Sequence, residues 1–254
     1  MPLAFERTIF LLALLGLLCA AGCQTMNVTR EEAGVPEGVV IFSFDDGPNT
    51  HAGSTARLLD VLRRHEIRAF FVLLGENVRE APELVRRMLA EGHYLVNHGY
   101  RDKFAIFMDE EEFCANLDQG EAAIVEALGG DWSGSRLYRP HGGFYSQAQA
   151  ELWRIRGYRL LPASLRFYDA ALGEADREKL VEEVVAELAK RGGGLILLHD
   201  ARGAHGRAAA ETALAPGGPF NRGWLPEAVE EIIRAARERG FVFGGPETAA
   251  FGEH

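Results

Sequence analysis

Side chains of the kinds that hold metals and move protons occur in four short stretches of this sequence. They are Asp45-Asp46-Gly47-Pro48, Asn97-His98 followed by Asp102, Arg139-Pro140-His141-Gly142-Gly143, and His199-Asp200. Together they offer carboxylates for a general base or a metal, imidazoles for a metal or a general acid, and a guanidinium that can orient a carboxylate. Each stretch follows a run of apolar residues, so each stands where a buried strand would end.

Each stretch has an ordinary structural explanation when it is taken alone. Asp-Asp-Gly-Pro is a good turn sequence, and a histidine that closes a strand is often a satisfied edge residue. Joint placement is harder to explain this way, because carboxylates, histidines and an arginine would converge on one rim. Charged side chains that lie so close together cost free energy, unless a metal or a proton-transfer reaction requires them there. The convergence therefore predicts an active site.

The elements that must position these residues follow an alternating pattern. Short apolar runs predict strands, and the amphipathic stretches between them predict helices, as in a parallel α/β sheet. We expect strands at 39–44, 69–74, 94–96, 135–138, 158–161, 195–198 and 241–243, and helices at 54–65, 81–91, 109–128, 146–155, 175–191 and 226–239. Ser54, Asp109 and Ser146 are candidate N-caps. About seven units predict a distorted, incomplete (β/α) barrel, or else a doubly wound open sheet, with the site at the carboxyl ends of the strands.

Composition and charge limit the function classes. The 254 residues are 47% hydrophobic, which is enough for one sizeable core, and nothing in the chain forces a second domain. The formal net charge of -10 argues against a nucleic-acid-binding surface, because phosphate contacts need clustered Lys and Arg. We expect a neutral or cationic partner instead.

The amino terminus predicts export. An apolar run from Ile9 to Ala21 is too short to span a bilayer comfortably, so residues 1–22 are expected to be a signal peptide. The segment "CAAGC" resembles a bacterial lipobox, which implies lipidation of Cys23 and an outer-membrane lipoprotein facing the periplasm or the cell surface; a secreted protein is the alternative. Residues 23–36 are polar without a period and predict a tether, so the catalytic domain is expected at 37–250.

The four stretches also resemble the motifs of a known family, the polysaccharide deacetylases, also called the NodB homology domain or carbohydrate esterase family 4. The resemblance covers residues 37–245, and the motifs appear in family order. The family's Thr-Phe-Asp-Asp-Gly-Pro is "SFDDGP" here, with Ser43 in place of Thr. The resemblance implies that Asp45 is the catalytic base and Asp46 a metal ligand.

The second motif departs from the family pattern. The family has His-Ser/Thr-x-x-His, whereas "NHGYRD" keeps His98 and has Asp102 in place of the second histidine. Asp102 could be a true ligand, an outer acceptor, or a solvent-facing partner of Arg101 or Lys103. We expect a ligand, because the spacing is retained and carboxylates bind metals.

The remaining motifs imply the other catalytic roles. The family's Arg-Pro-Pro-Tyr-Gly appears as "RPHGG", in which Arg139 would orient the base and the backbone N–H of Gly142 would face the oxyanion. The fourth motif lacks its usual Trp, although Asp169 corresponds to the acid that tunes the catalytic histidine. In "LILLHD", Leu197 would wall the acetyl methyl and His199 would be the general acid.

The resemblance implies a divalent metal, with Zn expected first and Mn or Co as alternatives. His51, His141 and His205 are further histidines near the rim; one could complete the metal shell, but loop histidines more often face solvent. Tyr100 and Tyr145 are expected to line a sugar-binding groove. The leading hypothesis is metal-dependent hydrolysis of N-acetyl groups on an envelope or extracellular polysaccharide. An O-acetyl esterase and an inactive sugar-binding lipoprotein are the alternatives.

Overall fold

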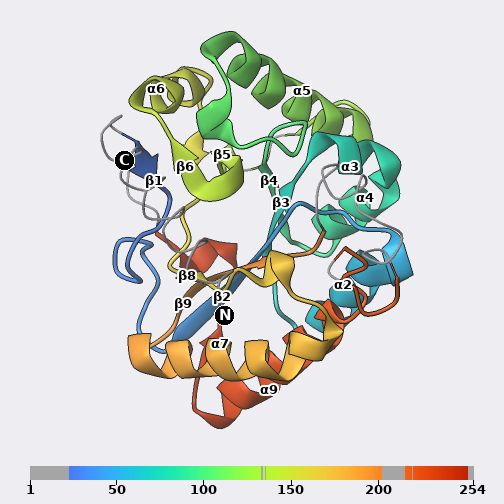
Figure 1. Ribbon diagram of the computed structural model, residues 1–254, viewed down its shortest axis with the longest axis vertical. Helices are drawn as coiled ribbons and strands as arrows, with labels where there is room; N and C mark the ends of the chain where they lie inside the picture. The colour runs from blue at the N-terminus through green and yellow to red at the C-terminus, as the bar shows by residue number, and fades with distance from the viewer. Residues whose placement is uncertain (1–22, 133, 135, 202–214, 219, 251–254) are drawn as a thin grey trace, which may run out of the picture.

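A parallel sheet forms the centre of the molecule (Figure 1). The computed structural model describes residues 23–132, 134, 136–201, 215–218 and 220–250, so the expected signal peptide and His205 lie outside the described residues. Along the sheet the strands are β7 (Arg159–Leu160), β5 (Leu137–Tyr138), β4 (Tyr94–Asn97), β3 (Phe70–Leu73), β2 (Val39–Asp45), β9 (Gly194–His199) and β8 (Leu165–Arg166). β10 (Val242–Phe243) pairs with β2, and every pairing in this sheet is parallel.

Helices surround the sheet, and this confirms the predicted incomplete α/β barrel. They are α2 (Ser54–Arg64), α3 (Gly75–Glu80), α4 (Pro82–Ala90), α5 (Glu110–Leu128), α6 (Gln147–Ile155), α7 (Arg177–Arg191) and α9 (Leu225–Glu238). Figure 1 shows α7 and α9 side by side along one edge, with α5 and α6 at the opposite edge. All seven expected strands and six expected helices are present. The two-residue β8 and the short α3 were not predicted, because neither is long enough to show a period.

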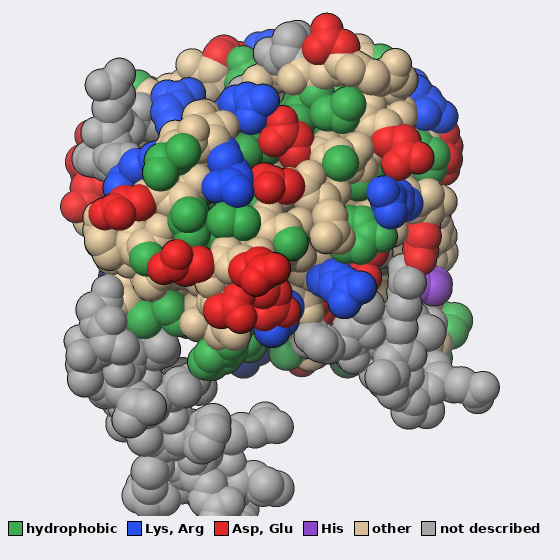
Figure 2. Space-filling model, turned by 90° about the horizontal axis from the view of Figure 1, so that it is seen from above, with side chains coloured by type: hydrophobic (Ala, Val, Ile, Leu, Met, Phe, Trp, Pro, Cys, Tyr) green, Lys and Arg blue, Asp and Glu red, His purple; other side chains and the backbone are tan. Residues whose placement is uncertain are grey.

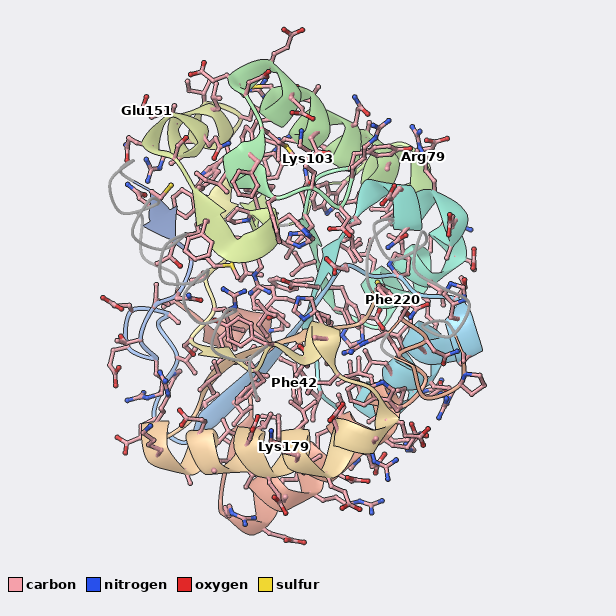
Figure 3. The ribbon with its side chains drawn as sticks, in the orientation of Figure 1. Phe42, Arg79, Lys103, Glu151, Lys179 and Phe220 are labelled. Atoms are coloured by element: carbon pink, nitrogen blue, oxygen red, sulfur yellow. The ribbon has the colours of Figure 1, made fainter. Side chains whose placement is uncertain are left out.

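Strand β2 shows how the sheet separates core from site. Val40, Phe42 and Phe44 pack with the helices in the main hydrophobic core, whereas Ile41 packs in a second core on the other face. Successive side chains of a strand point to opposite faces, so Ser43 and Asp45 share the face of Ile41. Figure 3 shows Phe42 in the interior and Glu151 at the periphery. The strand thus carries its polar residues toward the barrel interior.

Helix starts follow the predicted capping at two of three positions. Asp109 accepts a hydrogen bond from the backbone N–H of Glu112 at 2.8 Å, and Ser146 forms a capping box with Gln149. Ser54 was expected to cap α2 but lies inside the helix, after Gly53 as N-cap. Its hydroxyl donates instead to the carbonyl of Arg222 at 3.0 Å, because a distant loop offers an acceptor.

Residues 24–36 pack on the domain, contrary to the predicted tether. β1 (Gln24–Thr25) pairs antiparallel with β6 (Phe144–Tyr145), and the N–H of Met26 donates to Gly143 O at 3.0 Å. Met26, Ala33 and Val35 are 2%, 0% and 2% exposed. These apolar residues are too irregularly spaced to reveal burial, and their partners are far away in the sequence.

The surface carries charges of both signs. In the face shown in Figure 2, Lys and Arg side chains stand among Asp and Glu and isolated hydrophobic side chains. Among the described residues, no helix combines the length and the apolar character needed to cross a bilayer.

Candidate active site

A buried carboxylate and arginine lie at the carboxyl end of β2. Arg139 Nη1 donates to Asp45 Oδ1 at 2.5 Å and to Ser43 Oγ at 2.9 Å, and Nη2 donates to Pro162 O at 2.8 Å. Asp45 is 3% exposed and Arg139 is fully buried. Asp45 Oδ2 faces the next cluster, 3.9 Å from His98 Nε2. The guanidinium therefore holds one carboxylate oxygen and leaves the other turned toward the histidines.

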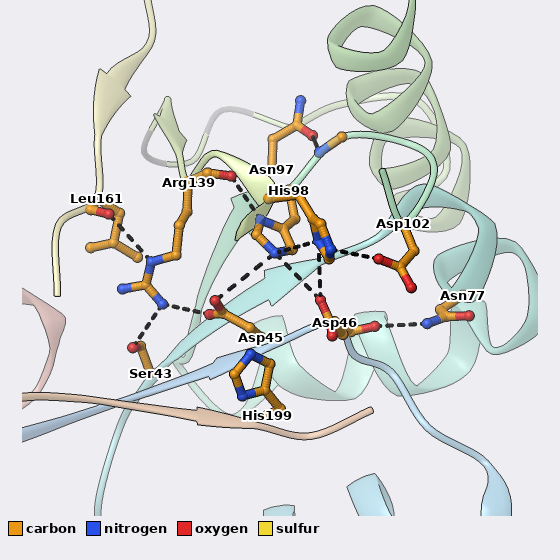
Figure 4. A network of polar contacts seen from close by, with 12 residues as sticks. Ser43, Asp45, Asp46, Asn77, Asn97, His98, Asp102, Arg139, Leu161 and His199 are labelled. Carbon is orange, nitrogen blue, oxygen red and sulfur yellow. Dashed lines mark hydrogen bonds and ion pairs between the residues drawn. The ribbon is translucent and has the colours of Figure 1, made fainter. Parts of the chain in front are cut away.

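The next cluster joins Asp46, His98 and His141, which approach from three different loops. Asp46 Oδ1 lies 3.4 Å from His98 Nε2 and 3.6 Å from His141 Nδ1, and the two histidine nitrogens are 3.3 Å apart. Asp46 adopts a left-handed backbone conformation with φ of 71°, which a non-glycine residue rarely keeps outside functional sites. Its carbonyl accepts from Asn77 Nδ2 at 2.7 Å. Figure 4 shows Asp45, Asp46 and His98 turned toward one another.

These three ligand atoms fit a divalent metal. A tetrahedral Zn ion with bonds of about 2.0–2.1 Å has ligands roughly 3.3–3.4 Å apart, close to the three separations found here. Asp46 Oδ1 is buried and accepts no hydrogen bond within the described part of the chain. His98 Nδ1 lies 2.7 Å from Arg139 O, an acceptor only, so Nδ1 carries the proton and the lone pair of Nε2 faces the cluster.

Electrostatics favour the metal-binding form of the carboxylate. Burial alone would raise the pKa of Asp46, but the facing imidazoles of His98, His141 and His199 outweigh burial and hold this pKa below its ordinary value. The same pairing raises the pKa of His98 despite its burial, chiefly through its contact with Asp46. Asp46 is thus ionised. A metal cation bound between Asp46 and the histidines would supply the positive charge that protons on the imidazoles supply without it.

Asp102 does not take the ligand position predicted for it. Its Oδ1 lies 2.5 Å from His141 Nε2, on the side of the imidazole away from Asp46 and His98. Among the described residues the cluster of possible metal ligands is Asp46, His98 and His141. His141 was expected to face solvent and instead occupies the third position. His51 is exposed, as expected for a loop histidine.

A second buried pair holds His199 at the end of β9. Asp169 Oδ1 lies 2.8 Å from His199 Nδ1, and Asp169 Oδ2 accepts the backbone N–H of His199 at 2.9 Å. Burial would lower the pKa of His199, but the charge and hydrogen bond of Asp169 raise it above its ordinary value. Nε2 of His199 is then left to act as a proton donor.

Arg222 supports this pair and was missed in the sequence. Its guanidinium donates to Asp169 Oδ2, to Asp169 O at 2.8 Å and to His199 O, and it lies over the Trp224 ring at 4.6 Å. The side chain is fully buried. The only sequence signal is an arginine in the turn "NRGW" before the last helix, and such a residue is usually a surface one.

Of the residues expected to contact substrate, Leu197 and Gly142 lie near the site, whereas Tyr145 does not. Leu197 is 2% exposed and packs with Met26 and Ala163 beneath the end of β9, where it can wall a small group. Gly142, with φ of 79°, lies beside the ring of Phe104. The prediction for Tyr145 is wrong, because it is 7% exposed and packs edge-on against Trp153 at 4.7 Å.

Tyr100 is also directed away from the site. Its hydroxyl accepts from Arg79 at 3.1 Å, and its ring lies under that guanidinium on α3. The exposed aromatic beside the cluster is instead Phe104, which is 51% exposed and lies 5.4 Å from the His141 ring at an interplanar angle of 30°. Phe104 lies outside the motifs, so it was not singled out from the sequence.

Comparisons with known proteins identify the family of this chain. A family model described as "Polysaccharide deacetylase" matches residues 32–161. The chain is 32% identical to a chitooligosaccharide deacetylase of Rhizobium leguminosarum bv. trifolii over 175 residues, covering 68% of this chain and 77% of the relative. It is 28% identical to a peptidoglycan-N-acetylglucosamine deacetylase of Bacillus cereus, covering 78% of this chain and 89% of the relative.

Solved structures share the fold. The chitin deacetylase from Colletotrichum lindemuthianum superposes with a TM-score of 0.69 at 21% identity, covering 91% of this chain and 94% of that one. A family 4 carbohydrate esterase from Streptomyces lividans, in complex with acetate, gives 0.63 at 23% identity, covering 85% and 96%. With the family match and the identity to its relatives, the chain belongs to the polysaccharide deacetylase family, carbohydrate esterase family 4.

Proposed function

We propose that this protein is a metal-dependent hydrolase that removes acetyl groups from an N-acetylated, GlcNAc-type polysaccharide and releases acetate. One observation carries the proposal: three metal-ligand atoms with separations of 3.3–3.6 Å lie directly beside a carboxylate held by an arginine. The named activities of the relatives from Rhizobium and Bacillus support acetylated amino sugars as substrates.

The proposed base is Asp45 and the proposed acid is His199. Arg139 holds Asp45 Oδ1, so Oδ2 is free to take a proton from an attacking water near the cluster. Asp169 keeps His199 protonated and oriented, so this imidazole can protonate the departing amine. Leu197 would wall the acetyl methyl, and the Gly142 N–H would face the developing oxyanion.

Asp46, His98 and His141 would hold the metal. When bound there, a divalent cation supplies Lewis acidity toward the acetyl carbonyl and lowers the pKa of a water molecule. Two imidazoles and one carboxylate form a donor set that suits Zn, and Mn or Co remain candidates. We expect Zn, because the donor separations match short tetrahedral bonds.

Aromatic side chains at the rim support a sugar substrate. Phe104 stands beside the cluster, and Phe107, which is 58% exposed, lies 6.1 Å from it between ring centroids. Exposed aromatic rings beside a polar site are costly in water unless a ligand with apolar faces covers them. Pyranose rings have such faces.

We also propose export with a lipid on Cys23. The lipobox-like segment "CAAGC" supports this proposal. Because β1 begins at Gln24, an anchor on Cys23 would hold the domain close to the membrane without a free tether. Radiolabelled palmitate incorporated by the parent and lost in Cys23→Ala would support the lipid; equal labelling of both would exclude it.

Acetate release tests the activity. The metal-stripped protein would be given Zn, Mn or Co and then chitooligosaccharide, N-acetylated peptidoglycan or acetylated xylan. We expect acetate from the N-acetylated substrates only with metal present, and about 10²–10⁴-fold less from Asp45→Asn and His199→Ala. Acetate from xylan alone would indicate an O-acetyl esterase, and no acetate from any substrate would leave a sugar-binding protein.

A further inference from the structure

We infer that the third metal ligand of this protein is His141 and that Asp102 is a positioning residue that sets the tautomer of His141. This inference rests on the proposed metal dependence. Compared with the family motifs, the chain has lost a histidine at Asp102 and gained one at His141, where "RPHGG" has His in place of the second Pro. The two residues that differ are in direct contact, with Nε2 and Oδ1 2.5 Å apart.

The geometry separates the two roles. His141 presents Nδ1 to Asp46 at 3.6 Å and to His98 at 3.3 Å, whereas its Nε2 faces Asp102. The two nitrogens of an imidazole lie on different edges of the ring, so a carboxylate bound at Nε2 lies behind the ring when Nδ1 faces a metal. Asp102 accepts the Nε2 proton and leaves the lone pair on Nδ1.

The arrangement repeats the one at His98 with the nitrogens exchanged. There, Nδ1 donates to Arg139 O at 2.7 Å, and Nε2 faces Asp46. Each histidine thus has one nitrogen directed into the cluster and one fixed by an acceptor. An acceptor on the outer nitrogen orients the ring and makes the inner nitrogen a stronger ligand.

Neighbouring rings fix the plane of His141. Phe104 stacks on it at 5.4 Å between centroids, and His98 lies 5.0 Å away on the cluster side. Gly142 permits this packing, because a Cβ there would lie 2.2 Å from the Phe104 ring. The family's Tyr at this position would collide with Phe104. Glycine at position 142 therefore accompanies the shift of the metal-binding histidine from position 102 to position 141.

Metal affinity tests the inference without reference to acetate release. Zn binding to the metal-stripped full chain would be measured by competition calorimetry for the parent, His98→Ala, His141→Ala, Asp102→Ala and Asp102→Asn. We expect His141→Ala to lose at least as much Zn affinity as His98→Ala. Asp102→Ala should lose about 10–100-fold in Zn affinity. Asp102→Asn should lose less, because the amide oxygen of the new side chain can still accept the Nε2 proton of His141. Lys103→Ala is the control for a change in the same loop, because the Lys103 ammonium contacts Glu112 at 2.6 Å. This variant should bind Zn as the parent does.

The double variant distinguishes a positioning residue from a ligand. If Asp102 acts through His141, then adding Asp102→Ala to His141→Ala should cost little further affinity. Two results would overturn the inference and make Asp102 the ligand. One is a Zn affinity of His141→Ala close to that of the parent. The other is a Zn affinity of the double variant that falls below that of His141→Ala by as much as Asp102→Ala alone falls below the parent.

Nitrogen NMR on the unaltered Zn-bound protein provides a measurement that needs no variant. We expect metal-bound Nδ1 and protonated Nε2 for His141, with the opposite assignment for His98. A His141 with Nδ1 protonated would overturn the inference. An inactive protein that still shows these signals would refute the proposed function alone.

Discussion

The carboxylate of Asp169 holds His199 at two points: Oδ1 lies 2.8 Å from the imidazole Nδ1, and Oδ2 accepts the backbone N–H at 2.9 Å. The carboxylate thereby sets both the position and the protonation of the proposed acid. Asp169 has a pKa below its ordinary value, because His199 and Arg222 outweigh the burial that would raise it. It is therefore charged at neutral pH.

Asp169→Asn should move the alkaline limb of the pH–rate profile to lower pH. The protonated form of His199 is the acid, and the negative charge of Asp169 raises its pKa, so removal of this charge makes His199 lose its proton at lower pH. The profile of kcat for the parent and the variant measures the shift, with His199→Ala as the reference for loss of the acid. Superimposable profiles would show that Asp169 does not tune His199.

Arg222→Met should lower the free energy of unfolding by about 3–5 kcal/mol, because it leaves Asp169 buried without its guanidinium. Arg234→Ala is the control, since Arg234 is 67% exposed in its pair with Glu230 and such pairs contribute about 0–1 kcal/mol. Urea denaturation measures both. Equal small losses would mean that Arg222 does not stabilise the buried pair.

Asp200 should make the protein less stable above neutral pH. Burial raises the pKa of this fully buried carboxyl to about 7, although Thr55 donates to it at 2.6 Å. The folded state then holds a proton between about pH 4 and 7 that the unfolded state has released, so stability falls as pH rises through this range. Between pH 6 and 8 the ionisation of Asp200 should lower the free energy of unfolding by about 1.4 kcal/mol.

Asp200→Asn should remove this component of the pH dependence. The difference in unfolding free energy between parent and variant, followed from pH 6 to 8 by urea denaturation, isolates Asp200 from the other titrating groups. A difference that stays constant over this range would contradict the assignment.

Phe104→Ala should raise KM for a chitooligosaccharide by about 3- to 10-fold, because the exposed ring would no longer stack on a sugar. Leu89→Ala is matched for exposure, 45% against 51% for Phe104, and lies on α4. Initial rates against oligosaccharide concentration give KM and kcat separately. A fall in kcat without a rise in KM would show that Phe104 acts through His141 rather than on the sugar.

Met26→Ala should cost about 2–5 kcal/mol of stability, because Met26 is 2% exposed and packs with Leu197. Thr25→Ala, at an exposed neighbouring position, should stay within about 0.5 kcal/mol. Thermal and urea unfolding of the full chain test both. A free tether would make the two substitutions equally harmless.

Much of the fold and part of the site could be predicted from local patterns. Strands such as 39–44 and 195–198 show as continuous apolar runs, and polar residues after such strands must lie on one rim of a parallel sheet. Five site residues stand at such strand ends: Asp45, Asp46, His98, Arg139 and His199. Tyr145 was misplaced, because an aromatic next to a motif looks the same whether its strand turns it toward the site or toward Trp153.

The sequence by itself determined the kinds of groups at the strand ends and therefore the chemistry available on the rim. Tertiary structure decided which groups meet. Asp102 has the spacing of a ligand, but spacing constrains only a residue's own loop, whereas coordination depends on distances of a few tenths of an ångström between loops. Packing of Phe104 on His141 and pairing of His141 with Asp102 decide those distances, and both join loops that are far apart in the chain.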